Sequence, residues 1–150
     1  MARHVTVNAK LRRPEICGAA ESLLIDNTLV ERLLPLLTDD LVKGGCTLRG
    51  DQACQKIDPR IGAASKEDWS TEYLDKIISV KVVNGVDEAI SHINRFGSNH
   101  TEAVLTKNED VATRFLDGVD SGIVLHKEST KLAEGGEIGM AAENGISTGQ

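Results

Sequence analysis

The chain has 150 residues, of which 40% are hydrophobic, 27% charged and 3% aromatic, and its formal net charge is −6. These values predict one globular domain with an aliphatic core, and they argue against a general nucleic-acid surface or an anionic-membrane surface. No apolar stretch approaches the roughly 20 residues of a membrane span, and the three cysteines lack metal-ligand spacing. We therefore expect reduced thiols, no metal site and a cytoplasmic protein.

Helical and extended patterns alternate through most of the chain. The strand runs are short and rich in β-branched residues, and the helical stretches repeat apolar residues every three or four positions. This alternation favours an α/β/α layered domain with a mostly parallel sheet. The expected elements are helices at 5–10, 29–37, 86–93 and 111–116, strands at 22–25, 46–49, 77–83, 103–106 and 123–125, and a mostly loop segment at 51–66 with one short helix.

Polar residues and glycines predict where these helices begin and end. Asn27 or Thr28 is the expected N-cap of the second helix, and Pro35 either interrupts that helix or starts another one. Asn108 is the expected N-cap of the last helix. Helix ends are expected at glycines 44–45, 97 and 118.

The last 24 residues differ from the rest. Residues 127–150 hold five glycines and little periodicity, which is typical of a functional loop or a frayed end. We expect residues 1–126 to form the α/β domain and residues 127–150 to be a glycine-rich loop and tail of the same domain.

Cys17 follows a proline turn and precedes small residues that can begin a helix. A thiol at a helix N-terminus feels the positive end of the helix dipole, and the nearby Arg12 and Arg13 favour the thiolate further. Backbone N–H groups at such a turn could also face a developing oxyanion. Because free cysteines are often buried structural residues, the local pattern leaves both interpretations of Cys17 open.

Five motifs, in the same order, resemble those of γ-glutamyl phosphate reductases, which belong to the aldehyde dehydrogenase superfamily. Residues 8–25 resemble the active-site cysteine segment, and the likeness continues through residues 48–51. Residues 67–75, Glu-Asp-Trp-Ser-Thr-Glu-Tyr-Leu-Asp, resemble a signature of that family. Residues 97–103 and 135–139 carry the last two motifs. The resemblance implies an aldehyde dehydrogenase catalytic-domain fold.

The resemblance also implies a reaction. Cys17 matches the nucleophile, whose thiolate would attack γ-glutamyl phosphate and expel phosphate to leave a γ-glutamyl thioester. Hydride from NADPH would then reduce the thioester to glutamate 5-semialdehyde, in proline biosynthesis.

Other positions match the cofactor and substrate sites of that family. Glu72 matches the glutamate that binds the nicotinamide-side ribose, and Leu74 would lie near the nicotinamide. Ser98, His100 and Thr101 match a loop that faces the substrate. The alternatives are a solvated loop acid for Glu72 and a surface histidine for His100.

A further set of residues has weaker assignments. Arg12 and Arg13 could help to neutralise the acyl phosphate, although arginines are more common on helix surfaces. We interpret Cys46 and Cys54 as structural residues and Trp69 as a packing residue.

By the same resemblance, the NADPH-binding half would lie mainly before the cysteine segment and an oligomerising strand region would follow it. We expect both to be absent here, which leaves an incomplete NADPH site in a chain that is inactive alone and belongs to a homo-oligomeric enzyme. Asn144 also stands where an apolar residue is expected. The alternative hypotheses are a non-catalytic binding or assembly module and a small α/β domain with an unknown ligand.

Overall fold

The computed structural model describes residues 2–15 and 18–126. Predictions for Cys17, for the glycine-rich residues 135–139 and for Asn144 therefore lie outside the described residues. The elements are α1 (Ala2–Leu11), β1 (Ser22–Asp26), α2 (Val30–Lys43), β2 (Thr47–Gly50), α3 (Gln52–Ile57), β3 (Gly62–Ala63), the 3₁₀ helix η1 (Glu67–Ser70), β4 (Ile77–Val83), α4 (Gly85–Phe96), β5 (Thr101–Val104), α5 (Glu109–Gly118) and β6 (Ile123–His126).

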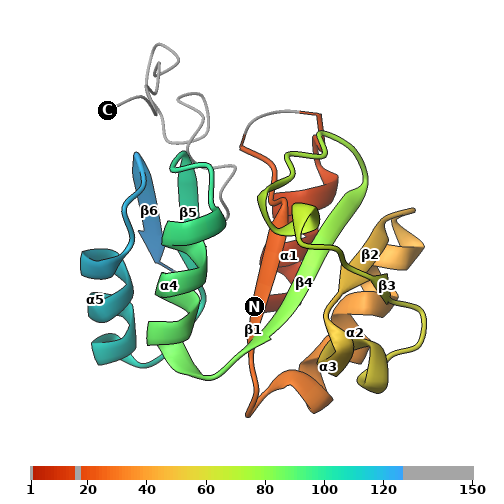
Figure 1. The fold of residues 1–150 in the computed structure, drawn as a ribbon, viewed down its shortest axis with the longest axis horizontal. Coiled ribbons are helices and arrows are strands. Elements are labelled where there is room, and N and C mark those ends of the chain that lie inside the picture. The colour runs from red at the N-terminus through yellow and green to blue at the C-terminus, as the bar shows by residue number, and fades with distance from the viewer. Residues whose placement is uncertain (1, 16–17, 127–150) are drawn as a thin grey trace.

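The strands form two parallel sheets. One has four strands in the order β1-β4-β2-β3, and the other pairs β5 with β6. Figure 1 shows the two sheets next to each other, with α1 behind β1 and β4 and with α4 in front of β5. The expected α/β class with a mostly parallel sheet is confirmed, since every strand pair in the described residues is parallel.

Strand β4 is the centre of the larger sheet. The strand Ile77–Val83, in which five of the seven residues are Ile or Val, pairs with β1 on one side and with β2 on the other. A parallel strand that is covered on both faces is expected to be continuously apolar, and Ile78 and Val80 are completely buried. They belong to a core cluster that also includes Leu34, Leu37 and Leu41 of α2.

The observed ends of α2 correct one prediction. The N-cap is Leu29, which makes no side-chain cap bond, so neither Asn27 nor Thr28 caps this helix. Asp26 organises the turn instead, because its Oδ1 accepts hydrogen bonds from the N–H and the hydroxyl of Thr28. Pro35 lies inside one continuous helix, which settles that alternative.

Most other predicted boundaries agree with the structure. Asn108 caps α5 by accepting hydrogen bonds from the N–H groups of Asp110 and Val111. The short helix predicted within residues 51–66 is α3. Strand β5 starts at Thr101, two residues before the predicted start.

The end of β1 is joined to the start of α4. Asp26 Oδ2 accepts a hydrogen bond of 3.0 Å from the N–H of Gly85, whose φ of +86° favours glycine. The hydrogen bonds from Thr28, with a smaller contribution from the Gly85 N–H, hold the pKa of Asp26 below its ordinary value. The joint fixes α4 beside β1, on one side of the cavity described below.

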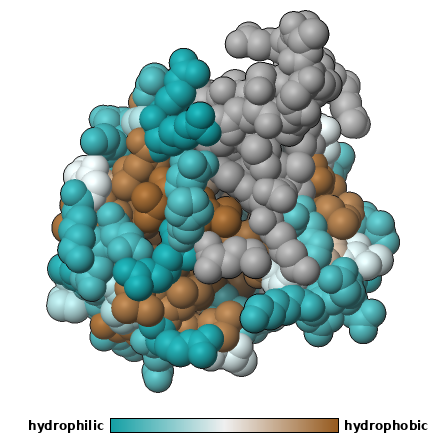
Figure 2. Space-filling view, turned by 180° about the vertical axis from the view of Figure 1, so that it is seen from behind, coloured by the Kyte–Doolittle hydropathy of each residue, from teal (hydrophilic) through white to brown (hydrophobic). Residues whose placement is uncertain are grey.

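The face opposite to that of Figure 1 carries apolar patches between hydrophilic side chains (Figure 2). Five large apolar side chains are at least 40% exposed in the described residues: Leu29, Leu36, Val42, Leu74 and Leu116. In the same residues, no helix is long and apolar enough to cross a membrane.

Candidate active site

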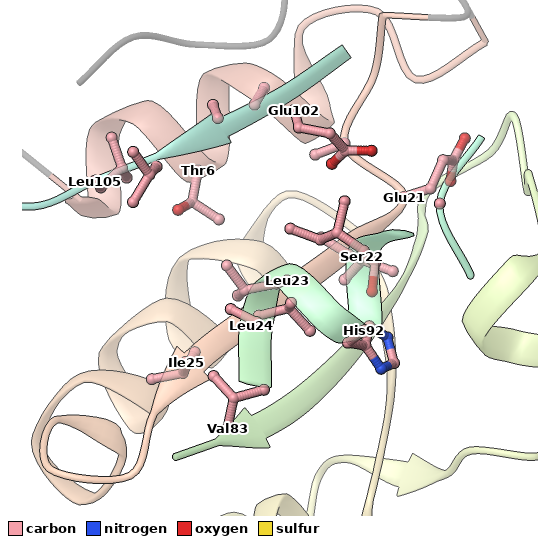
Figure 3. Close-up of a pocket in the computed structure, with 18 of the residues that line it drawn as sticks. Thr6, Glu21, Ser22, Leu23, Leu24, Ile25, Val83, His92, Glu102 and Leu105 are labelled. Carbon is pink, nitrogen blue, oxygen red and sulfur yellow. The ribbon is translucent and has the colours of Figure 1, made fainter. Parts of the chain in front are cut away.

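A cavity of about 630 Å³ lies between the two sheets. Its lining includes all five residues of β1 and all four residues of β5, together with residues of α1 and α4. Figure 3 shows residues that line the cavity, with Glu102 on the side of Ser22 and Leu105 on the side of Ile25. The lining is mainly apolar, and several of its polar residues, Glu21, Ser22, His100, Thr101 and Glu102, lie at the amino ends of β1 and β5.

The structure brings together four of the residues predicted from the sequence. Glu72, Ser98, His100 and Thr101 all line this cavity, and so does Gly18, the residue that follows Cys17. Segments that lie more than 70 residues apart in the sequence therefore meet at one site. The functional roles of these residues stay predictions.

Leu74 does not belong to the described lining of the cavity. Its side chain is 45% exposed and its φ is +51°, an uncommon conformation for a residue other than glycine. Its N–H donates a hydrogen bond of 3.1 Å to Oε1 of Glu21. In this structure the backbone of Leu74 is thus hydrogen-bonded to the Glu21 carboxylate. Its proposed position near a nicotinamide stays a prediction.

Glu21 links three parts of the site. One carboxylate oxygen accepts the bond from Leu74, and the other accepts a hydrogen bond of 2.9 Å from Nζ of Lys10. Lys10 is completely buried in α1, and an isolated ammonium there would carry a large desolvation cost. The ion pair therefore ties α1 to the start of β1 and to the segment that follows Glu72.

A second carboxylate holds the segment that presents Glu72. Asp68 is 6% exposed and accepts hydrogen bonds from Arg49 at 3.0 Å, from Tyr73 at 2.5 Å and from both the N–H and the hydroxyl of Ser65. Burial opposes ionisation of Asp68, but these donors outweigh it and lower its pKa to about 2. The bond from Tyr73 closes a short loop around Glu72, whose own side chain is exposed.

The loop after α4 carries the other polar residues. Nδ1 of His100 lies 2.6 Å from the hydroxyl oxygen of Thr101, so one of these groups donates a hydrogen bond to the other. His100 is half-buried, which argues against a purely surface position for it. A ring nitrogen and two hydroxyl groups in one cavity can bind a carboxylate or phosphate oxygen.

The surroundings of Cys17 differ from the prediction in one respect. No helix begins at the described residues 18–20, which form a turn and a bend leading into β1. The proposed activation of the thiol by the dipole of a following helix is therefore wrong. The N–H of Ala20 donates to the carbonyl of Ala9 and Lys10 holds Glu21, so both contacts tie this segment to α1. Arg12 and Arg13 follow α1 and are exposed.

The two described cysteines are buried and far less acidic than a free thiol. Burial raises the pKa of the Cys46 thiol to about 11 and that of the Cys54 thiol to about 12. Both are therefore protonated at neutral pH, in agreement with the structural role predicted for them.

Two residues of the cavity escaped the sequence analysis. Glu102 points into the apolar lining, and desolvation raises its pKa to about 7. His92 is 8% exposed, packs edge-on against Trp69, and its Nε2 has no hydrogen-bond partner among the described residues. The sequence held a signal for Glu102, because it is a glutamate within an otherwise apolar strand. It held no signal that distinguished His92 from a histidine on a helix surface.

The described residues contain no group of three or more histidine, cysteine or acidic side chains that could hold a metal ion. The polar groups of the cavity instead suit a small organic substrate with anionic and cationic parts, because carboxylates, hydroxyls and an imidazole are placed around an apolar interior.

No family model matches the chain. Over all 150 residues it is 56% identical to the γ-glutamyl phosphate reductase of Parvibaculum lavamentivorans and 53% identical to that of Rhodopseudomonas palustris. These matches cover 35% and 34% of the two proteins, so the chain spans about a third of the length of such relatives.

Solved structures give the same result. The crystal structure of γ-glutamyl phosphate reductase from Thermotoga maritima superposes with a TM-score of 0.94 and 42% identity, over 97% of this chain and 35% of that one. A propionaldehyde dehydrogenase from Clostridium phytofermentans superposes with a TM-score of 0.65 at 16% identity, which supports the fold alone. The resemblance to the reductases and the aldehyde dehydrogenase-like fold expected from the sequence are confirmed.

Proposed function

We propose that this chain, which matches about a third of the γ-glutamyl phosphate reductases over its whole length, is the thiol-bearing part of such an NADPH-dependent reductase. The main support is that Glu72, Ser98, His100 and Thr101, predicted separately from two motifs, line one cavity together with Gly18, the neighbour of Cys17. The substrate would be γ-glutamyl phosphate and the product glutamate 5-semialdehyde, as the names and motifs of the relatives suggest.

In the proposed reaction, the thiolate of Cys17 attacks the acyl carbon and the bond from this carbon to the phosphate oxygen breaks. Inorganic phosphate leaves, and the γ-glutamyl group remains on sulfur as a thioester. NADPH, when bound, supplies the hydride that reduces this thioester. The resulting hemithioacetal expels the thiolate and releases the semialdehyde, so that the thiol is regenerated. Ser98, His100 and Thr101 would bind the anionic groups of the substrate.

The residues present fit a part of the NADPH site. The carboxylate of Glu72 is exposed at the edge of the cavity and makes no hydrogen bond to the described residues, so it is available to accept bonds from ribose hydroxyls. One such contact offers little affinity against the entropy lost on binding. The remaining contacts, and the oligomer interface, would come from the two thirds of the enzyme outside the matched region.

A chimera tests this proposal. The matched third of the P. lavamentivorans reductase is replaced by this chain, and NADPH oxidation is measured together with phosphate release. We expect activity within about tenfold of the parent enzyme, and a loss on the order of 10³-fold or more in the Cys17→Ser variant.

Cys46→Ala is the matched control, since it removes a buried protonated thiol and should leave the activity unchanged. A folded chimera that oxidises no NADPH, or a Cys17→Ser variant that keeps its activity, would contradict the proposal.

A further inference from the structure

The ion pair between Lys10 and Glu21 is almost completely buried. Nζ of Lys10 lies 2.9 Å from Oε2 of Glu21, and the two side chains are 0% and 19% exposed. A buried ion pair contributes little to stability, because an apolar pair of similar size often serves the packing as well or better. What such a pair does impose is a fixed orientation of its two side chains.

Three contacts hold the ends of the segment between α1 and β1, which contains the proposed nucleophile. The ion pair is the first, and the second is a hydrogen bond of 2.9 Å from the N–H of Ala20 to the carbonyl of Ala9. In the third, the carbonyl of Glu21 accepts a hydrogen bond of 3.0 Å from the N–H of Ser79 in β4. The ends of this segment are therefore fixed to each other and to the central strand of the larger sheet.

The second carboxylate oxygen of Glu21 holds the segment proposed to contact the cofactor. Oε1 accepts a hydrogen bond of 3.1 Å from the N–H of Leu74. The φ of Leu74 is +51°, a conformation that is uncommon for residues other than glycine and that persists where the surrounding contacts determine it. Tyr73, the residue before it, is held by Asp68. Glu21 therefore fixes the backbone two residues after Glu72.

We infer that Glu21, oriented by Lys10, is a positioning residue that aligns the nucleophile segment with the cofactor segment for hydride transfer. This role rests on the proposed function, in which Cys17 carries the acyl group and residues 72–74 lie at the nicotinamide side of NADPH. The rate of such a step depends steeply on the alignment of the reacting atoms, and a displacement of about 1 Å can cost roughly 100-fold. One carboxylate bonded to both segments limits such displacements.

Lys10 is needed because it keeps the carboxylate in place. The ammonium binds Oε2, which leaves Oε1 directed at the N–H of Leu74. Without this counter-ion, a carboxylate that is mostly buried would turn toward water, since an unpaired charge in such surroundings is costly. An uncharged side chain with a carbonyl acceptor has no such tendency. A carboxylate and an amide at position 21 should therefore behave differently once Lys10 is removed.

Rapid mixing tests this inference in the reverse direction, which crosses the same hydride-transfer transition state. The chimera is mixed with glutamate 5-semialdehyde and NADP⁺ in the absence of phosphate. The thiolate adds to the aldehyde carbonyl and hydride passes from that carbon to NADP⁺, so that each active site forms a thioester and a molecule of NADPH. The burst of NADPH gives the rate constant for hydride transfer, and its amplitude gives the fraction of intact active sites.

Three variants separate the contributions of the two side chains. Lys10→Met/Glu21→Met removes the ion pair and the acceptor of the Leu74 N–H, and its burst should be about 10- to 100-fold slower with an unchanged amplitude. Lys10→Met/Glu21→Gln restores a carbonyl acceptor, and its rate constant should lie within about threefold of the unsubstituted chimera. Lys10→Met alone should be slower than this amide variant, because its carboxylate lacks a counter-ion.

Arg3→Met/Asp40→Met is the matched control. This ion pair of 2.7 Å joins the same helix, α1, to α2 and lies outside the described lining of the cavity. Its removal should leave the rate constant and the amplitude unchanged. The rate of iodoacetamide labelling of Cys17 should stay within about threefold in every variant, because the bond between Ala9 and Ala20 still closes the nucleophile segment.

The inference is wrong if the double methionine variant keeps its rate constant, or if the amide variant is as slow as the double methionine variant. A fall in amplitude at an unchanged rate constant would also overturn it, since a merely structural role loses active sites and not speed. If the double methionine variant does not fold, equal rate constants for Lys10→Met and the amide variant would have the same meaning. A burst that is absent from the unsubstituted chimera, or that persists in Cys17→Ser, would instead overturn the proposed function and this inference with it.

Discussion

The part around the four-stranded sheet and the part around the two-stranded sheet are packed differently. All eleven residues of the core cluster lie between Ile25 and Val80, and several are completely buried. After residue 84, the buried apolar side chains among those described are Ala112, Phe115 and Val119, and all four residues of β5 are partly exposed. The first part builds its own core, whereas the second depends on contacts across the cavity.

The candidate site lies on the boundary between these two parts. Glu21 and Glu72 come from the first part, and Ser98, His100 and Glu102 come from the second. The relative position of these side chains therefore depends on how the two sheets are joined.

The largest expected effect is a loss of core packing in the first part. Leu34 of α2 is completely buried, so Leu34→Ala should lower the free energy of unfolding by about 2–5 kcal/mol. Leu36→Ala, on the same helix and 40% exposed, is the matched control and should change it by less than about 1 kcal/mol. Chemical denaturation followed by circular dichroism measures both.

Hydrogen exchange compares the stability of the part around the four-stranded sheet with that of the part around the two-stranded sheet. In the unsubstituted chain, the N–H groups of β4 should exchange more slowly than those of β5 and β6. Phe115→Ala in α5 should speed exchange in β5 and β6 and leave β4 unchanged. Equal protection of both sheets, or their joint loss in the Phe115 variant, would contradict the division into two parts.

A smaller and pH-dependent effect is expected at Glu102. Its pKa is raised to about 7 in the folded chain, so the folded state binds the proton more tightly than the unfolded state, whose carboxyl titrates near its ordinary value of 4.5. Stability should therefore fall as pH rises from about 4.5 to 7. Glu102→Gln should stabilise the chain by about 2–3 kcal/mol at pH 8 and by little at pH 4. Urea denaturation at both pH values tests this, and a pH-independent effect would refute it.

The smallest of these effects concerns the loop that holds Glu72. The pKa of Asp68 is lowered to about 2, so the stability it contributes is present above about pH 4 and is lost as pH falls through 2. Asp68→Asn should cost about 1–3 kcal/mol at pH 7, because the bonds to Arg49 and Tyr73 weaken. In the chimera it should also raise KM for NADPH more than it lowers kcat, and Glu67→Gln, on an exposed neighbour, should change neither.

Local sequence signals predicted much of the fold. The strand predicted at 77–83 from its many Ile and Val residues coincides with the observed β4, and the Asn108 cap follows from a side chain that bonds within its own turn. The Leu29 boundary was not predictable in this way, since Asp26 bonds both to Thr28 and to the distant Gly85. Contacts between distant residues decide such boundaries.

The site was predicted to a similar extent. Glu72 and His100, which were predicted from motifs, both line one cavity, and their roles stay predictions. His92 was missed because only tertiary packing turns it inward against Trp69. The raised pKa of Glu102 was missed because it depends on the desolvation that the fold imposes.

The rate of thiol labelling at each cysteine tests the central claim most directly. The account requires Cys17 to be ionised and accessible, while Cys46 and Cys54 have pKa values of about 11 and 12 and are buried. With iodoacetamide at pH 7 and peptide mass spectrometry as the readout, Cys17 should react at least tenfold faster than either of the others. Equal rates at all three positions would contradict the assignment of Cys17 as the nucleophile.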